Sequence, residues 1–440
     1  MAVRRPASPL SADLPGASLV RVARIGADGD GIAEPGPLYV PFTLPGERVR
    51  AVPVGRRHEG FSAIAEAVLT PSAERVAPPC PHFGACGGCA LQHWAMAPYL
   101  DWKIGLLAAA LRRAGYPDAV LAPISPTPPR TRRRVDLAIR RGPGGLAIGL
   151  HRVQGREIVD IVTCDVLDPT LVALIPALRG LLKSAAMLKR EASAVINLLD
   201  TGPDLLLRTD AAPDANDRTR FAEFAQRHGL ARIHWAMGNG LPEAICTLRP
   251  ARIEMSGVQV TPPAGAFLQA SPAAETAIRN AVVAGLPTKR TAKSQIAELF
   301  AGCGTLSFAM APHMRVAAFE GDAPAAASLQ DAANQAGLAG RVQAHLRDLV
   351  RQPLSAKELS AFACVVLDPP FGGALDQIGL IAASTVKRVI YVSCNPVALA
   401  RDAAILHAAG FSLLSATPVD QFLWSARLES VCVFSRERNS

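Results

Sequence analysis

From residue 295 onward, short apolar runs alternate with helical stretches, and each run is followed by a turn. Strands that are apolar throughout are covered on both faces, and their alternation with helices is typical of a doubly wound parallel sheet. The chain then ends in two strand-like runs without a long helix between them, which predicts an antiparallel edge. The runs are QIAELF, VAAFEGD, ACVVLDPP and RVIYVSC, then FSLLSATPVDQF and LESVCVFSR. We therefore expect an α/β domain over residues 263–440.

Acidic residues stand at the ends of successive runs. Glu320 ends the second run, Asp348 lies where a third should end, and Asp368 ends the fourth. The carboxyl ends of parallel strands meet at one edge of a sheet, and folds of this kind bind their ligands there. These carboxylates are therefore expected to share one crevice.

The loop after the first run, residues 302–305, contains small residues that let a ligand approach the backbone closely. The same glycines would suit a simple tight turn or the start of a dinucleotide site. The third glycine of the dinucleotide fingerprint is missing, because Ser307 stands there. Glu320 would accept hydrogen bonds from ribose hydroxyls. The combination favours S-adenosylmethionine over NAD.

The fifth run ends in Ser-Cys-Asn-Pro, which places Cys394 at the same edge. A lone cysteine is more often an inert apolar residue. A methyl-transferring enzyme has a use for a thiol when its target is C5 of uracil, because thiolate addition at C6 makes C5 nucleophilic. A base must later remove the C5 proton, and Glu429 in the final strand is the candidate. An ordinary surface glutamate is the alternative at that position.

Three of the nine cysteines lie within ten residues, with the spacing Cys80-x5-Cys86-x2-Cys89, and Cys164 is a fourth candidate ligand. An odd number of cysteines without an export signal argues against disulfides. Four thiolates fit either structural zinc or an iron–sulfur cluster. Zinc more often has paired Cys-x2-Cys motifs, and radical enzymes need Cys-x3-Cys-x2-Cys, so neither pattern matches.

Positive charge is concentrated in residues 102–160, which hold eleven Lys or Arg against four Asp or Glu in a chain of net charge +9. Nearby glycines and prolines predict loops or short strands that could follow a phosphate chain. A solvated basic face is the alternative. The arginines concerned are Arg130, Arg132, Arg133, Arg134, Arg140, Arg141, Arg152 and Arg156.

The first part of the chain has a different pattern. Four short β-type runs separated by turn clusters predict a small β-barrel over residues 14–70. A central α+β domain over residues 71–262 would follow, with helices over 97–115 and 170–190. No apolar run is long enough to span a bilayer, and the N-terminus lacks an export-type apolar core, so we expect a cytoplasmic protein without a membrane partner.

Four motifs, taken in order along the chain, resemble one family over nearly the whole sequence: the bacterial 23S rRNA (uracil-5-)-methyltransferases with an N-terminal TRAM domain and an iron–sulfur cluster. The motifs are CPHFGACGGCALQH at residues 80–93, FLQ ending at Gln269, LFAGCGTLSF at residues 299–308 and SCNP around Cys394. The resemblance implies an OB-like TRAM barrel, a central iron–sulfur domain and a Rossmann-like class I methyltransferase domain. It also implies a cytoplasmic enzyme, expected to be a monomer, that forms 5-methyluridine in 23S ribosomal RNA.

The resemblance assigns roles to individual residues. It implies that Cys394 is the nucleophile and Glu429 the base. A 4Fe-4S cluster would be held by Cys80, Cys86, Cys89 and Cys164. S-adenosylmethionine would be contacted by Gln269, Phe300, Thr305, Glu320, Asp348 and Asp368. A flipped-out uracil would then lie beside Cys394, with backbone phosphates on the arginines.

Some positions depart from the family pattern. Thr305 and Asp348 stand where Asn is common, and Arg427-Leu428 replaces the more familiar His-Val before the glutamate. Phe371 follows Asp-Pro-Pro where Arg is usual, which removes a cation near the site. We interpret that change as altered substrate or loop contacts, because Cys394 and Glu429 are both retained.

Three other functions compete with this interpretation. A tRNA (uracil-5-)-methyltransferase would share the catalytic domain, but the barrel and the cysteine cluster favour ribosomal RNA. A non-catalytic iron–sulfur RNA-binding assembly factor would not need Cys394 and Glu429. An NAD-dependent oxidoreductase would need a glycine at Ser307 and would leave the basic segment unexplained.

Overall fold

The computed structural model describes residues 16–34, 36–57, 59–289 and 291–436. The chain divides into two compact units, of which the first contains the chain up to Trp102 together with Trp424–Ala426. The second contains Lys103–Leu423 and the chain from Arg427 onward. None of the helices in the described part of the chain is long and apolar enough to cross a membrane.

The first unit contains a closed five-stranded barrel with the strand order β1-β2-β3-β5-β4. This confirms the small β-barrel expected from the sequence, although residues 14 and 15 of the expected range lie outside the described residues. The sequence analysis missed β2, because its small residues lack a β-type pattern. A side chain at Gly31 would meet the Thr43 hydroxyl at 2.1 Å, so only glycine fits there. The strands are β1 (Ser18–Ile25), β2 (Gly31–Glu34), β3 (Leu38–Val40), β4 (Arg48–Arg57) and β5 (Gly60–Thr70).

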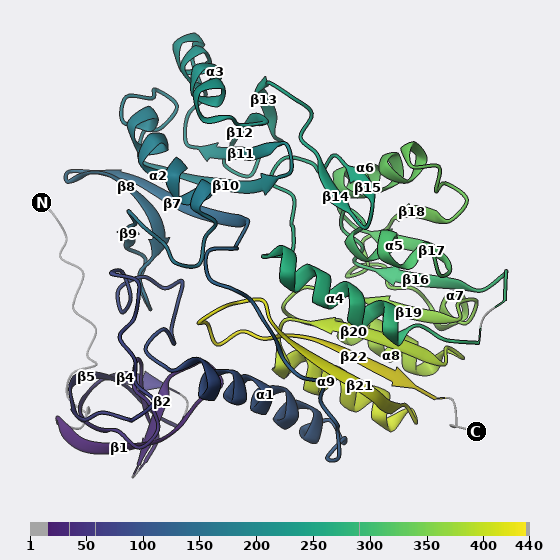
Figure 1. The fold of residues 1–440 in the computed structure, drawn as a ribbon, viewed down its shortest axis with the longest axis horizontal. Coiled ribbons are helices and arrows are strands. Elements are labelled where there is room, and N and C mark those ends of the chain that lie inside the picture. Colours follow the sequence, from purple (N-terminus) through teal and green to yellow (C-terminus); the bar gives the residue numbers. More distant parts are fainter. Residues whose placement is uncertain (1–15, 35, 58, 290, 437–440) are drawn as a thin grey trace, which may run out of the picture. The chain divides into compact units, whose positions relative to one another are not determined.

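The second unit contains a seven-stranded sheet with the order β13-β12-β11-β10-β7-β8-β9 (Figure 1). Helices α2 (Pro169–Leu182) and α3 (Ala215–His228) pack on one face of it through a shared apolar core. The strands are β7 (Arg134–Gly142), β8 (Gly145–His151), β9 (Ile158–Asp160), β10 (Glu191–Leu199), β11 (Gly202–Thr209), β12 (Arg232–Met237) and β13 (Glu243–Thr247).

Helix α2 is shorter than the expected helix over residues 170–190. The backbone N–H groups of Ala186 and Met187 donate to the Asp217 carboxylate at 3.2 and 2.9 Å. Asp217 is buried in the first turn of α3, a helix that the sequence analysis did not assign. The side chain of a distant helix therefore satisfies donors that a continued α2 would have satisfied itself.

The C-terminal part of the second unit is an eight-stranded sheet with the order β18-β17-β16-β19-β20-β22-β21-β6. Strands β16 to β20 are parallel to one another. Strand β22 runs antiparallel to both of its neighbours, β20 and β21, which gives the antiparallel end that the sequence predicted. The strands are β16 (Gln295–Leu299), β17 (Arg315–Glu320), β18 (Val342–Leu346), β19 (Cys364–Leu367), β20 (Arg388–Ser393), β21 (Ser412–Asp420) and β22 (Glu429–Ser435). Apolar cores lie on its two faces.

The edge of this sheet differs from the expectation. Strand β6 (Ser125–Pro126), within the proline-rich segment, pairs in parallel with β21 and covers the predicted edge strand. The short hairpin of β14 (Ile253–Met255) and β15 (Val258–Val260) packs into the same core as α4 (Pro272–Gly285). The other helices of the second unit are α5 (Thr305–Met310), α6 (Ala323–Gln335), α7 (Ala356–Leu359), α8 (Leu375–Ala383) and α9 (Pro396–Ala408), and α1 (Met96–Arg113) begins before the unit boundary.

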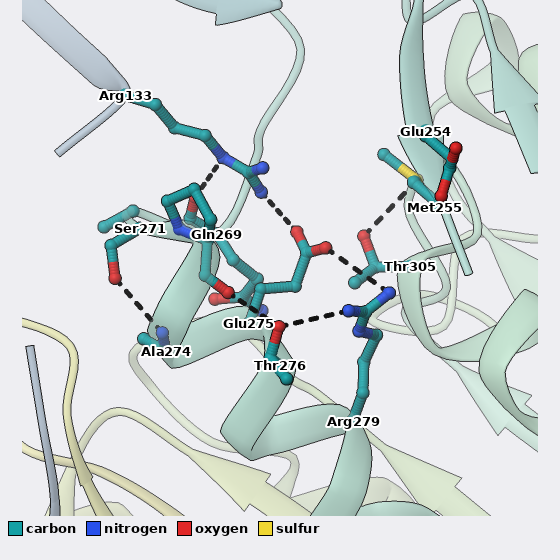
Figure 2. A network of polar contacts seen from close by, with 12 residues as sticks. Arg133, Glu254, Met255, Gln269, Ser271, Ala274, Glu275, Thr276, Arg279 and Thr305 are labelled. Atoms are coloured by element: carbon teal, nitrogen blue, oxygen red, sulfur yellow. Dashed lines mark hydrogen bonds and ion pairs between the residues drawn. The ribbon is translucent and has the colours of Figure 1, made fainter. Parts of the chain in front are cut away.

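Arg133 is buried rather than exposed to a phosphate chain, which makes the expectation of an RNA contact at this position wrong. Its backbone N–H donates to the Ala270 carbonyl at 2.9 Å, and its Nε donates to the Gln269 carbonyl at 3.0 Å. The guanidinium also pairs with the buried carboxylate of Glu275 in α4 (Figure 2). Arg279, one turn later, lies 3.9 Å from the other oxygen of Glu275. Arg133 thus fixes the segment that carries Gln269.

Replacing Arg133 by Met should lower the free energy of unfolding by about 3 kcal/mol, because it leaves the Glu275 carboxylate buried without its main partner. Arg140→Met is the matched control, since Arg140 forms an exposed pair with Glu191 and its loss should change stability by at most about 1 kcal/mol. Urea unfolding of the full chain measures both. Equal midpoints for the two variants would contradict the structural role of Arg133.

Candidate active site

The order of the strands brings three reactive side chains to one edge of the C-terminal sheet. Asp368 follows β19 and Cys394 follows β20, and these strands are parallel neighbours. Glu429 begins β22, which runs antiparallel beside β20 with Ser430 opposite Ser393. The start of an antiparallel strand lies at the edge where its parallel neighbour ends. The two residues expected to be nucleophile and base are therefore brought together with one expected cofactor contact.

Two glutamines connect the acids to the segment that Arg133 fixes. Gln269 Nε2 donates to Asp368 Oδ2 at 3.1 Å. Gln421 Nε2 donates to Glu429 Oε2 at 3.0 Å, and its Oε1 accepts the Ala270 N–H at 3.0 Å. Gln269, Gln421 and Glu429 each have less than a tenth of their surface exposed, whereas Asp368 is half-buried. The sequence analysis missed Gln421, because its loop position has no periodicity or motif that marks it.

The protonation of this edge is shifted toward neutral forms. Burial raises the pKa of Asp368 to about 7, although the hydrogen bond from Gln269 opposes the shift. Burial and the nearby Asp368 carboxylate raise the pKa of Glu429 well above its ordinary value. Burial, Glu429 and Asp368 together raise the pKa of the Cys394 thiol to about 12, and the Arg427 guanidinium opposes them. Strong shifts of several neighbouring groups are typical of functional sites.

Two buried oxygen atoms at this edge lack hydrogen-bond partners within the described chain. They are Oε1 of Gln269 and Oε1 of Glu429. Buried acceptors are almost always satisfied, because each unsatisfied one costs about 1–3 kcal/mol. The site therefore fits a ligand that brings hydrogen-bond donors or positive charge, as the amino-acid part and sulfonium of S-adenosylmethionine do.

The loop after β16 contains residues with positive φ angles, as is typical where a ligand approaches the backbone closely. Phe300 has φ +63° and Gly302 φ +56°, in the region that favours glycine. The Glu320 carboxylate at the end of β17 accepts the Gly302 N–H at 2.7 Å and the Asp322 N–H at 2.8 Å. Each oxygen keeps a lone pair for a further donor. Glu320 thus shapes the loop and remains able to accept from a ribose.

The remaining expected cofactor contacts lie beside this loop. Thr305 begins α5, and its hydroxyl lies 3.6 Å from the Met255 sulfur (Figure 2). Asp348 is exposed and accepts the backbone N–H groups of Val350 and Arg351 at 3.0 and 3.2 Å. Its Cα would lie 3.5 Å from a side chain added at Gly321, which places Asp348 next to the end of β17.

Ser307, which stands at the position of the third glycine of the dinucleotide fingerprint, makes an internal contact. It is fully buried in α5 and donates its hydroxyl proton to the buried carboxyl of Glu298 in β16. Burial raises the pKa of Glu298 to about 8. Sequence reasoning missed Glu298, although an acid inside an otherwise apolar strand is a signal that it has a partner.

The cysteines of the 80–89 loop and Cys164 belong to different compact units. All four thiols are half-buried, and Cys86 Sγ accepts the Gly88 N–H at 3.4 Å. Donors of this kind stabilise cluster-bound thiolates. Within the described ranges, no group of three or more His, Cys, Asp or Glu side chains is gathered closely enough to hold a metal ion. The chemistry of these thiol donors fits an iron–sulfur cluster.

Many of the arginines in the basic segment have partners inside the protein. Arg130 pairs with Asp165 at 2.7 Å, and Arg152 pairs with Glu157 at 3.0 Å. Arg141 donates to the carbonyls of Leu182 and Lys183 at the end of α2. Arg134 lies with Cζ 5.7 Å from the centre of the Phe267 ring. Several arginines of this basic segment therefore make contacts inside the protein, in addition to the charge that the segment exposes.

Comparisons with known proteins agree along almost the full length of the chain. An "uncharacterized RNA methyltransferase" of Caulobacter vibrioides is 40% identical over 422 residues, covering 94% of this chain and 98% of the relative. The 23S rRNA (uracil(1939)-C(5))-methyltransferase RlmD of Alkalilimnicola ehrlichii is 32% identical over 435 residues, covering 95% and 96%. No family model matches the chain.

A solved structure shares the fold. It is the Pyrococcus abyssi tRNA (uracil-54, C5)-methyltransferase in complex with S-adenosyl-L-homocysteine, with a TM-score of 0.73 and 21% sequence identity. The match covers 94% of this chain and 99% of that chain. The sequence relatives and the sheet edge described above lead to one conclusion: the chain belongs to the family of S-adenosylmethionine-dependent RNA (uracil-C5)-methyltransferases.

Proposed function

We propose that this enzyme methylates C5 of one uridine in 23S ribosomal RNA through a covalent adduct between Cys394 and C6 of the base. The observation that carries the proposal is the meeting of Cys394, Asp368 and Glu429 at one sheet edge, with strong pKa shifts in all three. A buried structural cysteine would not need two acids beside it. Uracil chemistry needs both a nucleophile and a base.

Cys394 supplies the nucleophile. Its thiolate adds to C6, and the electrons of the C5–C6 double bond move onto the O4 oxygen as an enolate. S-adenosylmethionine, when bound, would supply an electrophilic methyl group on a sulfonium. The enolate electrons form the bond from C5 to that methyl carbon, and the electrons of the broken sulfur–methyl bond return to sulfur, which leaves as a neutral thioether. Gln269, which is fixed by Arg133 and bonded to Asp368, is the side chain we assign to hold the cofactor beside Cys394.

Glu429 completes the cycle as the base. After methyl transfer, C5 carries both the methyl group and its original proton. Glu429 takes that proton, the C5–C6 double bond forms again, and the bond between C6 and sulfur breaks to release the thiolate. Burial that raises the pKa of Glu429 also makes its carboxylate a stronger proton acceptor. Gln421 orients the Glu429 carboxylate by donating to Oε2, which leaves Oε1 to accept the C5 proton.

Ribosomal RNA is the favoured substrate because the relative from Alkalilimnicola ehrlichii is named for 23S rRNA and is similar from the barrel to the last strand. The Pyrococcus abyssi tRNA (uracil-54, C5)-methyltransferase is less similar in sequence. Barrels of this kind and exposed arginines are common elements of RNA-binding surfaces. The enzyme would act as a monomer on an extruded base.

We also propose that Cys80, Cys86, Cys89 and Cys164 hold a 4Fe-4S cluster. The N–H donor on Cys86 Sγ and the compact spacing of the first three thiols support it. No step of methyl transfer uses the cluster. Its contribution would be structural, because metal binding by thiolates adds directly to the free energy of folding.

The roles of Cys394 and Glu429 can be distinguished by whether each variant accumulates a covalent complex with RNA. Cys394→Ala should form neither a covalent RNA complex nor 5-methyluridine, whereas Glu429→Gln should add and methylate but retain the C5 proton and stall. A denaturing gel of labelled RNA that contains the target uridine should show a slow band for Glu429→Gln alone. Normal turnover of Glu429→Gln would assign the base elsewhere. A band with Cys394→Ala would remove Cys394 as the nucleophile.

Anaerobically purified enzyme should be brown and contain about four iron atoms per chain, as one cubane requires. Cys86→Ser should lose the iron and the visible absorbance. Cys246→Ser is the matched control, because Cys246 is equally half-buried but lies in β13 outside the motif. Iron and sulfide assays measure both variants, and stoichiometric zinc in place of iron would contradict the cluster.

Deleting the gene should remove one 5-methyluridine from 23S ribosomal RNA and leave transfer RNA unchanged. Mass-spectrometric mapping of both RNAs from the deletion strain, and from the strain complemented with the gene, measures the change. Loss of the modification from transfer RNA alone would show that the enzyme belongs with the tRNA-modifying members of its family.

A further inference from the structure

The guanidinium of Arg427, in the last loop, lies over the ring of Phe371. The guanidinium carbon of Arg427 is 4.4 Å from the centre of the Phe371 ring, within the range of a cation–π contact. Phe371 follows the proline turn after Asp368, and Arg427 lies two residues before Glu429. The contact therefore joins the loops that carry the two acids of the candidate active site.

The backbone of Phe371 is in turn fixed relative to Cys394. The carbonyl of Phe371 accepts a hydrogen bond from Asn395 Nδ2 at 2.9 Å, and Asn395 directly follows Cys394. The next carbonyl, of Gly372, accepts from Arg401 at 2.9 Å. The Ala374 N–H donates to the buried Asp402 carboxylate at 2.9 Å. The ring has 51% of its surface exposed, but its backbone is held by α9.

The charges around Cys394 show why a cation is needed there. Its thiol is half-buried beside two carboxyl groups, those of Glu429 and Asp368, and both disfavour a thiolate. Arg427 is the cation whose field on this thiol has the opposite sign. A nucleophilic cysteine requires such a field, because the thiolate and not the thiol attacks.

We propose that Arg427, seated on the Phe371 ring, stabilises the Cys394 thiolate. This assignment rests on the proposed role of Cys394 as nucleophile. Arg427 acts through its charge on Cys394, and Phe371 is a positioning residue that holds the guanidinium at its place.

The test measures the thiol directly and needs no RNA. Iodoacetamide alkylation of the full chain is followed by mass spectrometry on the peptide that contains Cys394, between pH 7 and 9.5. The alkylation rate is proportional to the thiolate fraction and therefore rises with pH throughout this range. Arg427→Met raises the thiol pKa, because a favourable charge is lost, and should slow alkylation about tenfold at each pH, equivalent to roughly one pKa unit.

Matched variants separate charge from shape. Arg427→Lys retains the charge and should restore most of the rate, and Phe371→Leu should slow alkylation in the same direction by a smaller factor. Arg152→Met, an exposed arginine on the central sheet, should have no effect. The difference in alkylation rate between the wild type and Arg427→Met should become smaller in high salt, because Arg427 is exposed and salt screens its charge.

Alkylation of Arg427→Met at the wild-type rate would overturn the proposal. If RNA affinity fell while alkylation stayed unchanged, Arg427 would be a phosphate contact and the proposal would also be wrong. Urea midpoints of all variants confirm that the folded protein is compared. Failure of the proposed function is distinguishable, since it would show as methylation by Cys394→Ala, whereas alkylation reports only the state of the thiol.

Discussion

The antiparallel pairing of β22 with β20 is the constraint on which the candidate site depends. In a wholly parallel sheet, the residue that begins a strand lies at the edge opposite to the ligand crevice. Reversal of the last strand brings Glu429 to the carboxyl edge, beside Cys394. The pairing Ser393 with Ser430 sets this register, and a shift of one residue would turn Glu429 to the other face of the sheet.

The same edge concentrates groups that are unfavourable to bury together. Asp368 and Glu429 repel one another, and each is withdrawn from water, so both are shifted toward the neutral form. Amide donors from Gln269 and Gln421 offset part of that cost. The positive charge of a bound sulfonium would offset more of it. A site with this balance is stable enough to fold and is poised for a cationic cofactor.

Sequence periodicity predicted the strands of the C-terminal sheet to within a few residues, together with its antiparallel end, because buried parallel strands are continuous apolar runs. It failed where long-range partners decide local structure. Strand β6 consists of two residues in a proline-rich segment and exists only because β21 lies beside it. Helix α2 ends early because Asp217 captures the following N–H groups. Strand β2 has too few apolar residues to be recognised.

The amino-acid sequence by itself determined the doubly wound fold, the small barrel and the family, because strand periodicity and ordered motifs are local properties of the chain. It also singled out Cys394, Glu429 and the acids at the strand ends. Only the tertiary structure decided what surrounds them. The burial of Arg133, the bridge made by Gln421 and the contact of Arg427 with Phe371 join residues that are 8 to 151 positions apart. Their charge and exposure depend on these distant partners, and no local pattern in the sequence records which partner each one meets.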